Sequence, residues 1–196
     1  MSNNVSNILT INGTEEQVAK IREFIKGSNG ESISFQSFIP MPKNLKGKRN
    51  VNVKIGSMTI AIPDDMDWRY QNWGSKWDAM PIEDEAVEAP NRILFNTADE
   101  TPVAAISHLS EMFPDVSFHV IFSDENEDFY CGEYSISGGA MTNKVWYDVW
   151  GEAMDDISND QVMEYYFLTH EYARKEWKKD EDGEWVRVYE EEDEEA

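Results

Sequence analysis

Asp124, Asn126 and Asp128 stand at alternate positions, the spacing of the first three ligands in a calcium-binding loop. The position that such a loop gives to glycine holds Phe129, and Ser135 stands where the bidentate glutamate is required. The segment is therefore interpreted as the polar tip of a hairpin, and no calcium site is predicted.

The other residue types that carry chemistry are few. His108, His119 and His170 have no second His or Cys at metal-ligand spacing, so no transition-metal site is predicted. Cys131 is the one cysteine; it excludes an intramolecular disulfide and a cysteine zinc cage, and we expect it to be buried and inert. Glycine-rich phosphate loops and serine nucleophile motifs are absent. We therefore predict no catalytic residues and no cofactor, and a protein that is not an enzyme.

The charge of the chain is divided unevenly. The whole sequence carries -22, from 17 Lys and Arg against 39 Asp and Glu. Residues 1–62 hold 8 basic and 4 acidic residues (+4), which leaves 9 basic and 35 acidic residues (-26) for residues 63–196. Such a field repels nucleic acid and acidic membranes and attracts basic surfaces. The expected partner is a basic host protein that itself binds nucleic acid.

The acidic residues assigned to the interaction fall on predicted loops and helix faces. They are Glu83, Asp84, Glu85, Glu88, Asp124, Glu125, Glu127, Asp128, Asp155 and Asp156. One interpretation is a solvated surface that serves solubility. The other is a mimic of the phosphate backbone, because B-DNA presents one charge per about 1.7 Å of its axis.

Tryptophans supply candidate anchors for a partner. Trp68, Tyr70, Trp73 and Trp77 cluster within a predicted helix or compact turn over residues 67–79. These rings either plug the sheet or form a docking surface. The tryptophans predicted to anchor a partner are Trp73, Trp77, Trp146 and Trp150.

The one basic segment covers residues 43–62. Its candidate patch is Lys43, Lys46, Lys48 and Arg49. Two apolar runs flank Gly56-Ser57, which predicts a hairpin. The lysines either solvate this hairpin and discourage edge pairing, or dock on an acidic partner or on the chain's own acidic half.

Hydrophobic periodicity gives the elements that position these residues. Thr14 and Gln17 form a capping box at the start of a helix, and Pro102 is expected at the first position of a second helix. Predicted strands cover residues 7–12, 32–39, 92–97, 116–122 and 129–136. Two β-α-β halves follow, so the predicted fold is α+β: a ferredoxin-like antiparallel sheet with an inserted basic hairpin.

Three regions are predicted along the chain of 196 residues. Residues 1–140 form the ferredoxin-like domain. Residues 141–189 form an acidic helical appendage, with a helix capped by Ser158 or Asn159 and a terminal strand near residues 185–189. Residues 190–196 form a disordered acidic tail. Neither a secretory signal in residues 1–30 nor a membrane-length apolar run is read from the sequence, so the expected location is the cytoplasm of a host cell.

Several short segments carry a family resemblance. They are Phe38-Ile39-Pro40-Met41-Pro42, Asn72-Trp73-Gly74-Ser75-Lys76-Trp77-Asp78-Ala79, Phe95-Asn96-Thr97-Ala98 and Phe113-Pro114. Over about residues 5–140 the chain resembles the YubB-type ferredoxin-like domain family of phage and conjugative-plasmid proteins. The chain departs from that pattern at Asp99-Glu100, where an aromatic residue is expected. The resemblance implies the fold and a mobile-element origin; the family has no established activity, so it implies no catalytic residues.

Two functions of different classes follow. The first is a non-enzymatic phage or plasmid interaction protein that binds a basic host protein through its acidic surface, as a nucleic-acid mimic that inhibits host defence. The alternative is an accessory or structural module with a small-molecule or peptide site near the Trp-rich segment.

Overall fold

The computed structural model describes residues 3–48, 51–55, 57–62, 64–82, 89–125, 130–147 and 159–188. Its centre is a six-stranded sheet in the order β4-β5-β1-β6-β7-β8, antiparallel throughout. The strands are β1 (Asn4–Asn12), β4 (Met80–Pro81), β5 (Arg92–Ala98), β6 (Ser117–Asp124), β7 (Cys131–Ser137) and β8 (Ala140–Tyr147). The predicted α+β class is confirmed.

The helices and two smaller sheets complete the described chain. The helices are α1 (Glu15–Ile25), α2 (Phe35–Phe38), α3 (Asp65–Trp73), α4 (Val103–Met112), α5 (Asn159–Thr169) and the 3₁₀ helix η2 (Glu171–Glu176). The smaller sheets pair β2 (Val51–Ile55) with β3 (Met58–Ile62), and β9 (Trp177–Lys179) with β10 (Trp185–Arg187). Of the helices described, none is both long and apolar enough to span a bilayer.

The main core lies on one face of the six-stranded sheet. In β1, Val5, Leu9 and Ile11 are fully buried at positions that share a face, because side chains alternate along a strand. They form one cluster with buried residues of α1 and α4, such as Ile21 and Ile106. The helix α1 begins with the predicted capping box, which is confirmed: the Thr14 and Gln17 side chains accept each other's backbone N–H.

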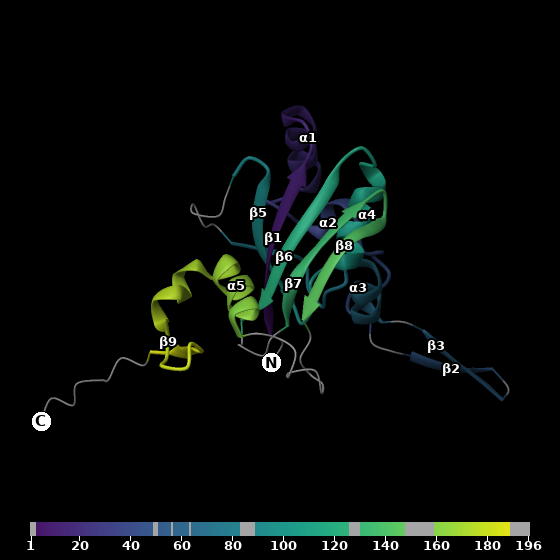
Figure 1. Cartoon of the computed structure of the whole chain (residues 1–196). Coiled ribbons are helices and arrows are strands. Elements are labelled where there is room, and N and C mark those ends of the chain that lie inside the picture. The colour runs from purple at the N-terminus through teal and green to yellow at the C-terminus, as the bar shows by residue number, and fades with distance from the viewer. Residues whose placement is uncertain are drawn as a thin grey trace, which may run out of the picture.

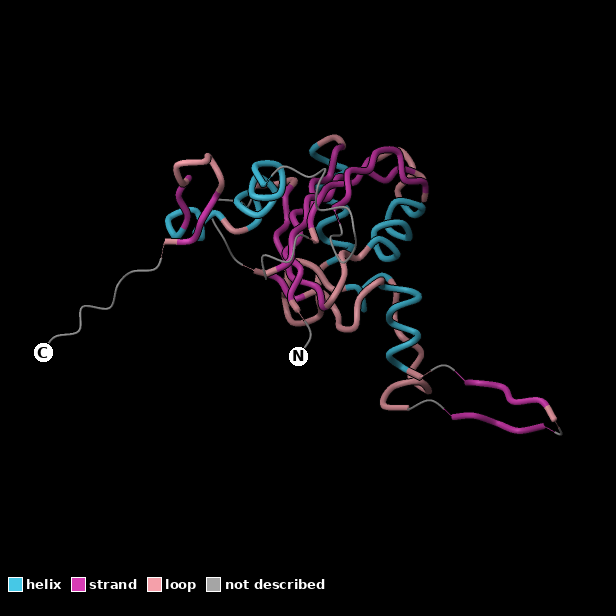
Figure 2. Tube along the Cα trace, turned by 60° about the horizontal axis from the view of Figure 1, so that its bottom comes forward, coloured by secondary structure: helices cyan, strands magenta, loops and turns pink. Residues whose placement is uncertain are grey.

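The opposite face of the sheet is partly covered by α5. Ser6, on the alternate parity of β1, contacts His170 just after α5, and Ser123 of β6 contacts Thr169 at its end. The helix therefore packs across the sheet from α1 and α4. Figures 1 and 2 place α5 with β9 and β10 on one side of the molecule and the β2–β3 hairpin on the other.

The strand predicted over residues 32–39 is wrong. This segment holds the short helix α2, in which Phe35 and Phe38 are both buried, and their rings lie edge to face at 6.2 Å. The Asp78 carboxylate accepts hydrogen bonds from the Ser34 hydroxyl and the Phe35 N–H at the start of the helix. This distant cap outweighs the local alternation of apolar residues.

The helical reading after residue 140 is also wrong for residues 141–147, which belong to β8. Gly138 and Gly139, interpreted as the end of the unit, have φ values of 55° and 79° and form the tight turn between β7 and β8. Val145 and Trp146 favour a pleated surface, so the sheet continues past residue 140. The helix after Asn159 and a strand from Trp185 are confirmed.

The start of α4 differs in one detail. Pro102 occupies the N-cap rather than the first helical position, and it supplies no side-chain cap. The Thr101 hydroxyl, one residue earlier, donates to Asn7 Oδ1 at 2.7 Å within the core. Asp99 accepts a hydrogen bond from the Tyr70 hydroxyl, and burial together with this bond raises the pKa of Tyr70 to about 12.

The predicted hairpin in the basic segment is confirmed as β2 and β3. The predicted tail at residues 190–196 lies outside the described residues.

Candidate functional site

The Trp-rich segment 72–79 has a structural role, because it connects neighbouring elements of the fold. The Trp73 side chain is 3% exposed, and its indole N–H donates to the Ile39 carbonyl at 2.9 Å. Its ring stands edge to face against Trp68 at 5.6 Å. Gly74 then ends α3 in the left-handed conformation with φ 72°. Burial thus removes Trp73 from the surface that a partner could reach.

Two polar side chains of the same segment fix its neighbours. The Ser75 hydroxyl accepts the Ala98 N–H at 3.1 Å, which ties the segment to β5. The Asp78 carboxylate accepts the Ser34 hydroxyl at 2.7 Å, which ties it to α2. The motif that carries the family resemblance therefore joins α2, α3 and β5.

Trp77, unlike Trp73, is an exposed tryptophan of this segment. Its side chain is 47% exposed, and two cations lie near its ring: the Arg69 guanidinium at 5.4 Å and the Lys76 ammonium at 5.5 Å from the centroid. Arg69 also forms an ion pair with Asp65 at 3.0 Å. An aromatic face flanked by two cations is a docking feature of the kind found at protein interfaces.

The basic turn before the hairpin is attached to the same helix. Asp65 Oδ2 accepts the Gly47 N–H at 3.0 Å, and the Asp65 N–H donates to the Lys48 carbonyl at 3.3 Å. Lys43, Lys46 and Lys48 are all exposed. We call the exposed lysines together with Arg69, Lys76 and Trp77 the basic–aromatic surface. Arg49, the fourth predicted residue of the patch, lies outside the described residues.

No protein-family model matches the chain, and no curated protein and no solved structure is significantly similar to it. The resemblance to the YubB-type family stays a hypothesis drawn from the residues, and function must be argued from the site.

The predicted acidic surface is represented in the structure by two residues. Asp124 is 7% exposed and lies 3.5 Å from the Asn3 side-chain nitrogen, so it is largely removed from solvent. Glu125 is exposed, and its carboxylate accepts the Asn4 backbone and side-chain N–H groups at 2.8 and 2.9 Å. The residues outside the described part of the chain are Glu83, Asp84, Glu85, Glu88, Glu127, Asp128, Asp155, Asp156 and Trp150.

Trp146 lies on β8 and is half-buried. One side of its ring meets Phe122 at 4.7 Å and Tyr134 at 6.0 Å, and the Lys144 ammonium lies 4.6 Å from its centroid. The ring therefore packs against aromatic residues of the sheet while remaining partly exposed beside the Lys144 ammonium.

A group of hydroxyls around His170 could not be found from sequence. The two ring nitrogens lie 3.1 Å from Ser6 Oγ and 3.3 Å from Ser123 Oγ, and Thr169 Oγ1 is 2.9 Å from Nδ1. His170 is 4% exposed, and desolvation lowers its pKa. The Tyr166 ring stacks on the imidazole at 4.7 Å. A serine and a histidine within hydrogen-bond reach could support nucleophilic catalysis, but this pair is sealed beneath α5.

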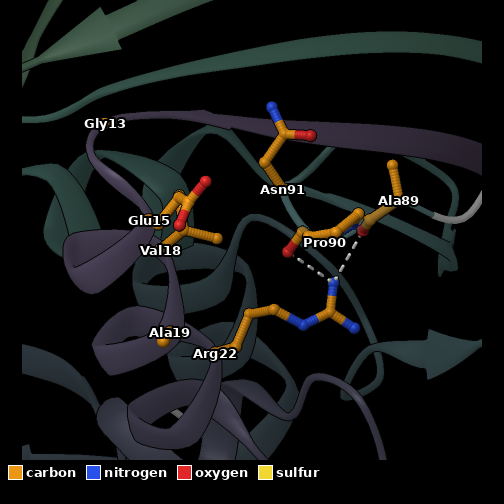
Figure 3. Close-up of a pocket in the computed structure, with 8 residues that line it drawn as sticks. All are labelled: Gly13, Glu15, Val18, Ala19, Arg22, Ala89, Pro90 and Asn91. Atoms are coloured by element: carbon orange, nitrogen blue, oxygen red, sulfur yellow. Dashed lines mark hydrogen bonds between the residues drawn. The ribbon is translucent and has the colours of Figure 1, made fainter.

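A hollow of about 1010 Å³ lies between α1 and the turn before β5 (Figure 3). Its charged lining residues are Glu15 and Arg22. The Arg22 Nη1 group donates to the carbonyls of Ala89, Pro90 and Arg92 at 2.9–3.3 Å, and Figure 3 draws the bonds to Ala89 and Pro90 as dashed lines. Arg22 thus holds the turn in place through its Nη1 group, which is directed at backbone carbonyls.

The cysteine behaves as expected. Cys131 is 2% exposed, and burial raises the pKa of its thiol to about 12, which disfavours the reactive thiolate. Within the part of the chain that is described, no group of three or more His, Cys, Asp or Glu side chains could hold a metal ion.

Proposed function

We propose that the chain is a non-enzymatic interaction protein whose acidic part binds a basic host protein. The observation that carries this proposal is the division of charge, +4 over residues 1–62 and -26 over residues 63–196. Opposite potentials on two proteins accelerate their encounter and favour the correct partner.

The chemistry of the described residues supports a binding role over catalysis. The hydroxyls around His170 are covered by α5, the thiol has a raised pKa, and Arg22 in the larger hollow is bound to carbonyls. None of these groups has both an activated nucleophile and access for a substrate.

The proposed partner is a nucleic-acid-binding protein of the host, with the acidic part standing in for the phosphate backbone. A chain of -22 can match a short stretch of duplex, which presents one charge per about 1.7 Å. A phage or plasmid origin, action in the host cytoplasm and inhibition of host defence belong to the same proposal.

A ferredoxin-like core is also part of the proposal. It is supported by the order β4-β5-β1-β6 and by α4, which connects two strands on either side of β1. In this arrangement β4 takes the place of the second strand that was expected over residues 32–39.

Trp77 and Trp146 are the proposed anchors among the described tryptophans. Both present part of a ring beside a cation, from Arg69 and Lys76 in one case and from Lys144 in the other. Such anchors would supply contact area once charge has guided the encounter.

The first experiment is a pull-down from host lysate at low salt, with a parallel wash at high salt. A salt-sensitive, nucleic-acid-binding host protein is expected, because screening weakens exposed charge pairs. Competition with duplex DNA for this protein then tests the mimicry. A captured protein that DNA does not displace would contradict the mimicry.

The second experiment measures association kinetics with that protein. Replacing Glu83, Asp84, Glu85 and Glu88 by Gln or Asn should slow association by about tenfold. The matched control replaces Glu15, Glu16, Glu23 and Glu31 by Gln, which removes the same charge from the N-terminal part. Equal effects from both sets, or unchanged kinetics, would refute steering by the acidic part.

The alternative, a module with a small-molecule or peptide site near the Trp-rich segment, has less support. The two hollows described have lining residues from α1 and its neighbouring turn and from α5, η2, β9 and β10, and neither set includes residues 72–79.

A further inference from the structure

The two edges of the six-stranded sheet differ in length and composition. At one edge, β4 covers only Met80–Pro81, and its proline has no N–H to donate to a further strand. At the other edge, β8 covers Ala140–Tyr147, contains no proline and pairs with β7 on one side. Figure 1 shows β8 as the outermost strand on its side of the sheet. Within the part of the chain that the structure describes, no strand pairs with the outer side of β8.

The outer side of β8 offers backbone hydrogen bonds. Alternate residues of an edge strand direct their N–H and C=O groups away from the sheet, which makes a template for another extended strand. Residues 140–144 are exposed and residues 145–147 are half-buried. Thr142 is an extra residue in the pairing with β7, and such a bulge interrupts an edge. The register is regular from Asn143 to Tyr147, so this is the stretch that can pair.

The charge on β8 is low for this chain. Lys144 is the one charged residue of the strand, and its ammonium lies 4.6 Å from the centroid of the Trp146 ring on the same strand. The chain as a whole carries -22, so two copies repel each other through their acidic parts. A strand with one positive charge meets less of this repulsion. Its residues Val145, Trp146 and Tyr147 also favour strand pairing.

We propose that β8 pairs with β8 of a second copy, antiparallel and about a twofold axis. A strand is complementary to itself in this orientation, so each copy supplies the same residues to the contact. The axis is perpendicular to the sheet, and the sheets of the two copies become one continuous sheet. The helices α1 and α4 of both copies then lie on one face, and α5 of both copies lies on the other. This inference does not depend on the proposed host partner.

The helix nearest to this contact leaves room for it. α4 packs on β6 and β7 rather than on the edge strand. Neighbouring strands lie about 4.8 Å apart, so the β7 strands of the two copies would be about 14 Å apart across the two β8 strands. Helices pack at about 8–10 Å, which is less than this separation. The two α4 helices therefore do not collide.

The first test is sedimentation equilibrium of the full chain over a range of protein and salt concentrations. The wild type should give a species of twice the chain mass of 22.6 kDa. High salt should strengthen this association, because salt screens the repulsion between two chains of -22. Capture of a basic host protein should instead weaken with salt, so the two proposals respond to salt in opposite directions.

The variant Asn143→Lys/Val145→Lys places two more cations on the edge strand. Lysines on an edge hinder pairing, and those of two copies would face each other across the axis. The dissociation constant should rise about tenfold or more. The matched control Met66→Lys/Leu168→Lys adds the same charge at exposed apolar positions of α3 and α5. The control lowers the net negative charge away from β8, so it should associate at least as tightly as the wild type.

Hydrogen exchange of the wild type supplies a second measurement, which stands even if the lysine variant fails to fold. The amides of residues 140–147 should exchange more slowly at concentrations where the dimer forms, because the outward N–H groups gain acceptors. The amides of residues 177–187, in β9, β10 and their turn, should exchange at the same rate throughout.

Three results would overturn the proposal. The first is a wild type that stays at 22.6 kDa at every protein and salt concentration. The second is a lysine variant on β8 that associates as tightly as its control. The third is exchange of residues 140–147 that does not depend on concentration. None of these results bears on capture of a basic host protein, so the two proposals fail separately.

Discussion

The Nε2 atom of His170 lies 3.1 Å from the hydroxyl oxygen of Ser6, a residue 164 positions earlier in the chain. The Nδ1 atom of the same ring lies 3.3 Å from Ser123 Oγ on the neighbouring strand. One imidazole thus connects the C-terminal elements to the two central strands of the sheet. Because desolvation lowers the pKa of His170, the docked arrangement favours the neutral ring.

Acidification should loosen α5 from the sheet. The pKa of His170 is lowered by docking, so the undocked state binds the proton more readily and docking is fully stable only above the ordinary pKa of 6.5. As the pH falls below 6.5, the docking free energy should decrease. The amides of α5 should then exchange faster with deuterium, and mass spectrometry of peptides from residues 159–169 measures this.

The His170→Asn variant separates this effect from the titration of carboxylates. It removes the imidazole from Ser6 and Ser123 and should cost about 1–3 kcal/mol of docking stability. Its exchange should lose the extra acceleration below pH 6.5. The negative charge of Glu125 opposes the lowering of the His170 pKa. The control variant is His108→Asn, because His108 is exposed. An unchanged acid response in His170→Asn would exclude His170 as the titrating group.

Removing the Asp78 carboxylate should destabilise the fold. In Asp78→Ala the Ser34 hydroxyl and the N–H groups of Phe35 and Ala79 lose their acceptor. We expect a loss of about 1–2 kcal/mol in the free energy of unfolding, measured in urea. Asp115→Ala, at an exposed position, should leave the urea midpoint in place. Equal midpoints for the two variants would mean that the cap contributes nothing.

Trp73 and Trp77 should give opposite results when replaced by Ala. Trp73→Ala empties a core site and should cost about 3–5 kcal/mol of unfolding free energy. Trp77→Ala changes a half-exposed ring beside Arg69 and Lys76, so stability should change by less than about 1 kcal/mol. If Trp77 is an anchor, the same variant should weaken capture of the basic partner. Thermal unfolding and partner binding of each variant measure these effects. Equal losses of stability in Trp73→Ala and Trp77→Ala would contradict the prediction.

Gly132→Ala should disturb the edge of the sheet. Gly132 has φ 151°, and an added Cβ would lie 2.2 Å from the Val145 carbonyl oxygen on β8. The strand β8 would have to move, and we expect a loss of more than about 2 kcal/mol in unfolding free energy. Gly138→Ala, in the turn at φ 55° with open space around it, should cost about 1–2 kcal/mol. A Gly132→Ala variant no less stable than Gly138→Ala would contradict the close approach of the strands.

Sequence patterns whose interacting residues lie close together in the chain predicted the structure correctly. Thr14 and Gln17 lie three residues apart, and their capping box forms as expected because both partners are in the same turn. Residues 32–39 were misread because their helix depends on Asp78, more than 40 positions away. The strand β8 was misread because its partner β7 supplies the hydrogen bonds that a helix would otherwise satisfy internally.

The same limit applies to the candidate site. The sequence identifies Trp77 and the lysines of the basic turn, but nothing in it distinguishes the exposed Trp77 from the buried Trp73. Ser6 and His170 carry no motif, because 164 positions separate them and only the sheet brings them together. The charge division needs no structure, since it is a property of the sequence.

The position of β1 has a consequence for synthesis on the ribosome. β1 is made first, yet it pairs with β5 and β6, which end at Ala98 and Asp124. At about 5–20 residues per second, the last residue of β6 follows the last residue of β1 by about 6–22 s. Until β6 is made, Leu9 and Ile11 lack their partners Val120 and Phe118 on that strand. The nascent N-terminal segment thus exposes apolar side chains that a chaperone can protect until β6 is made.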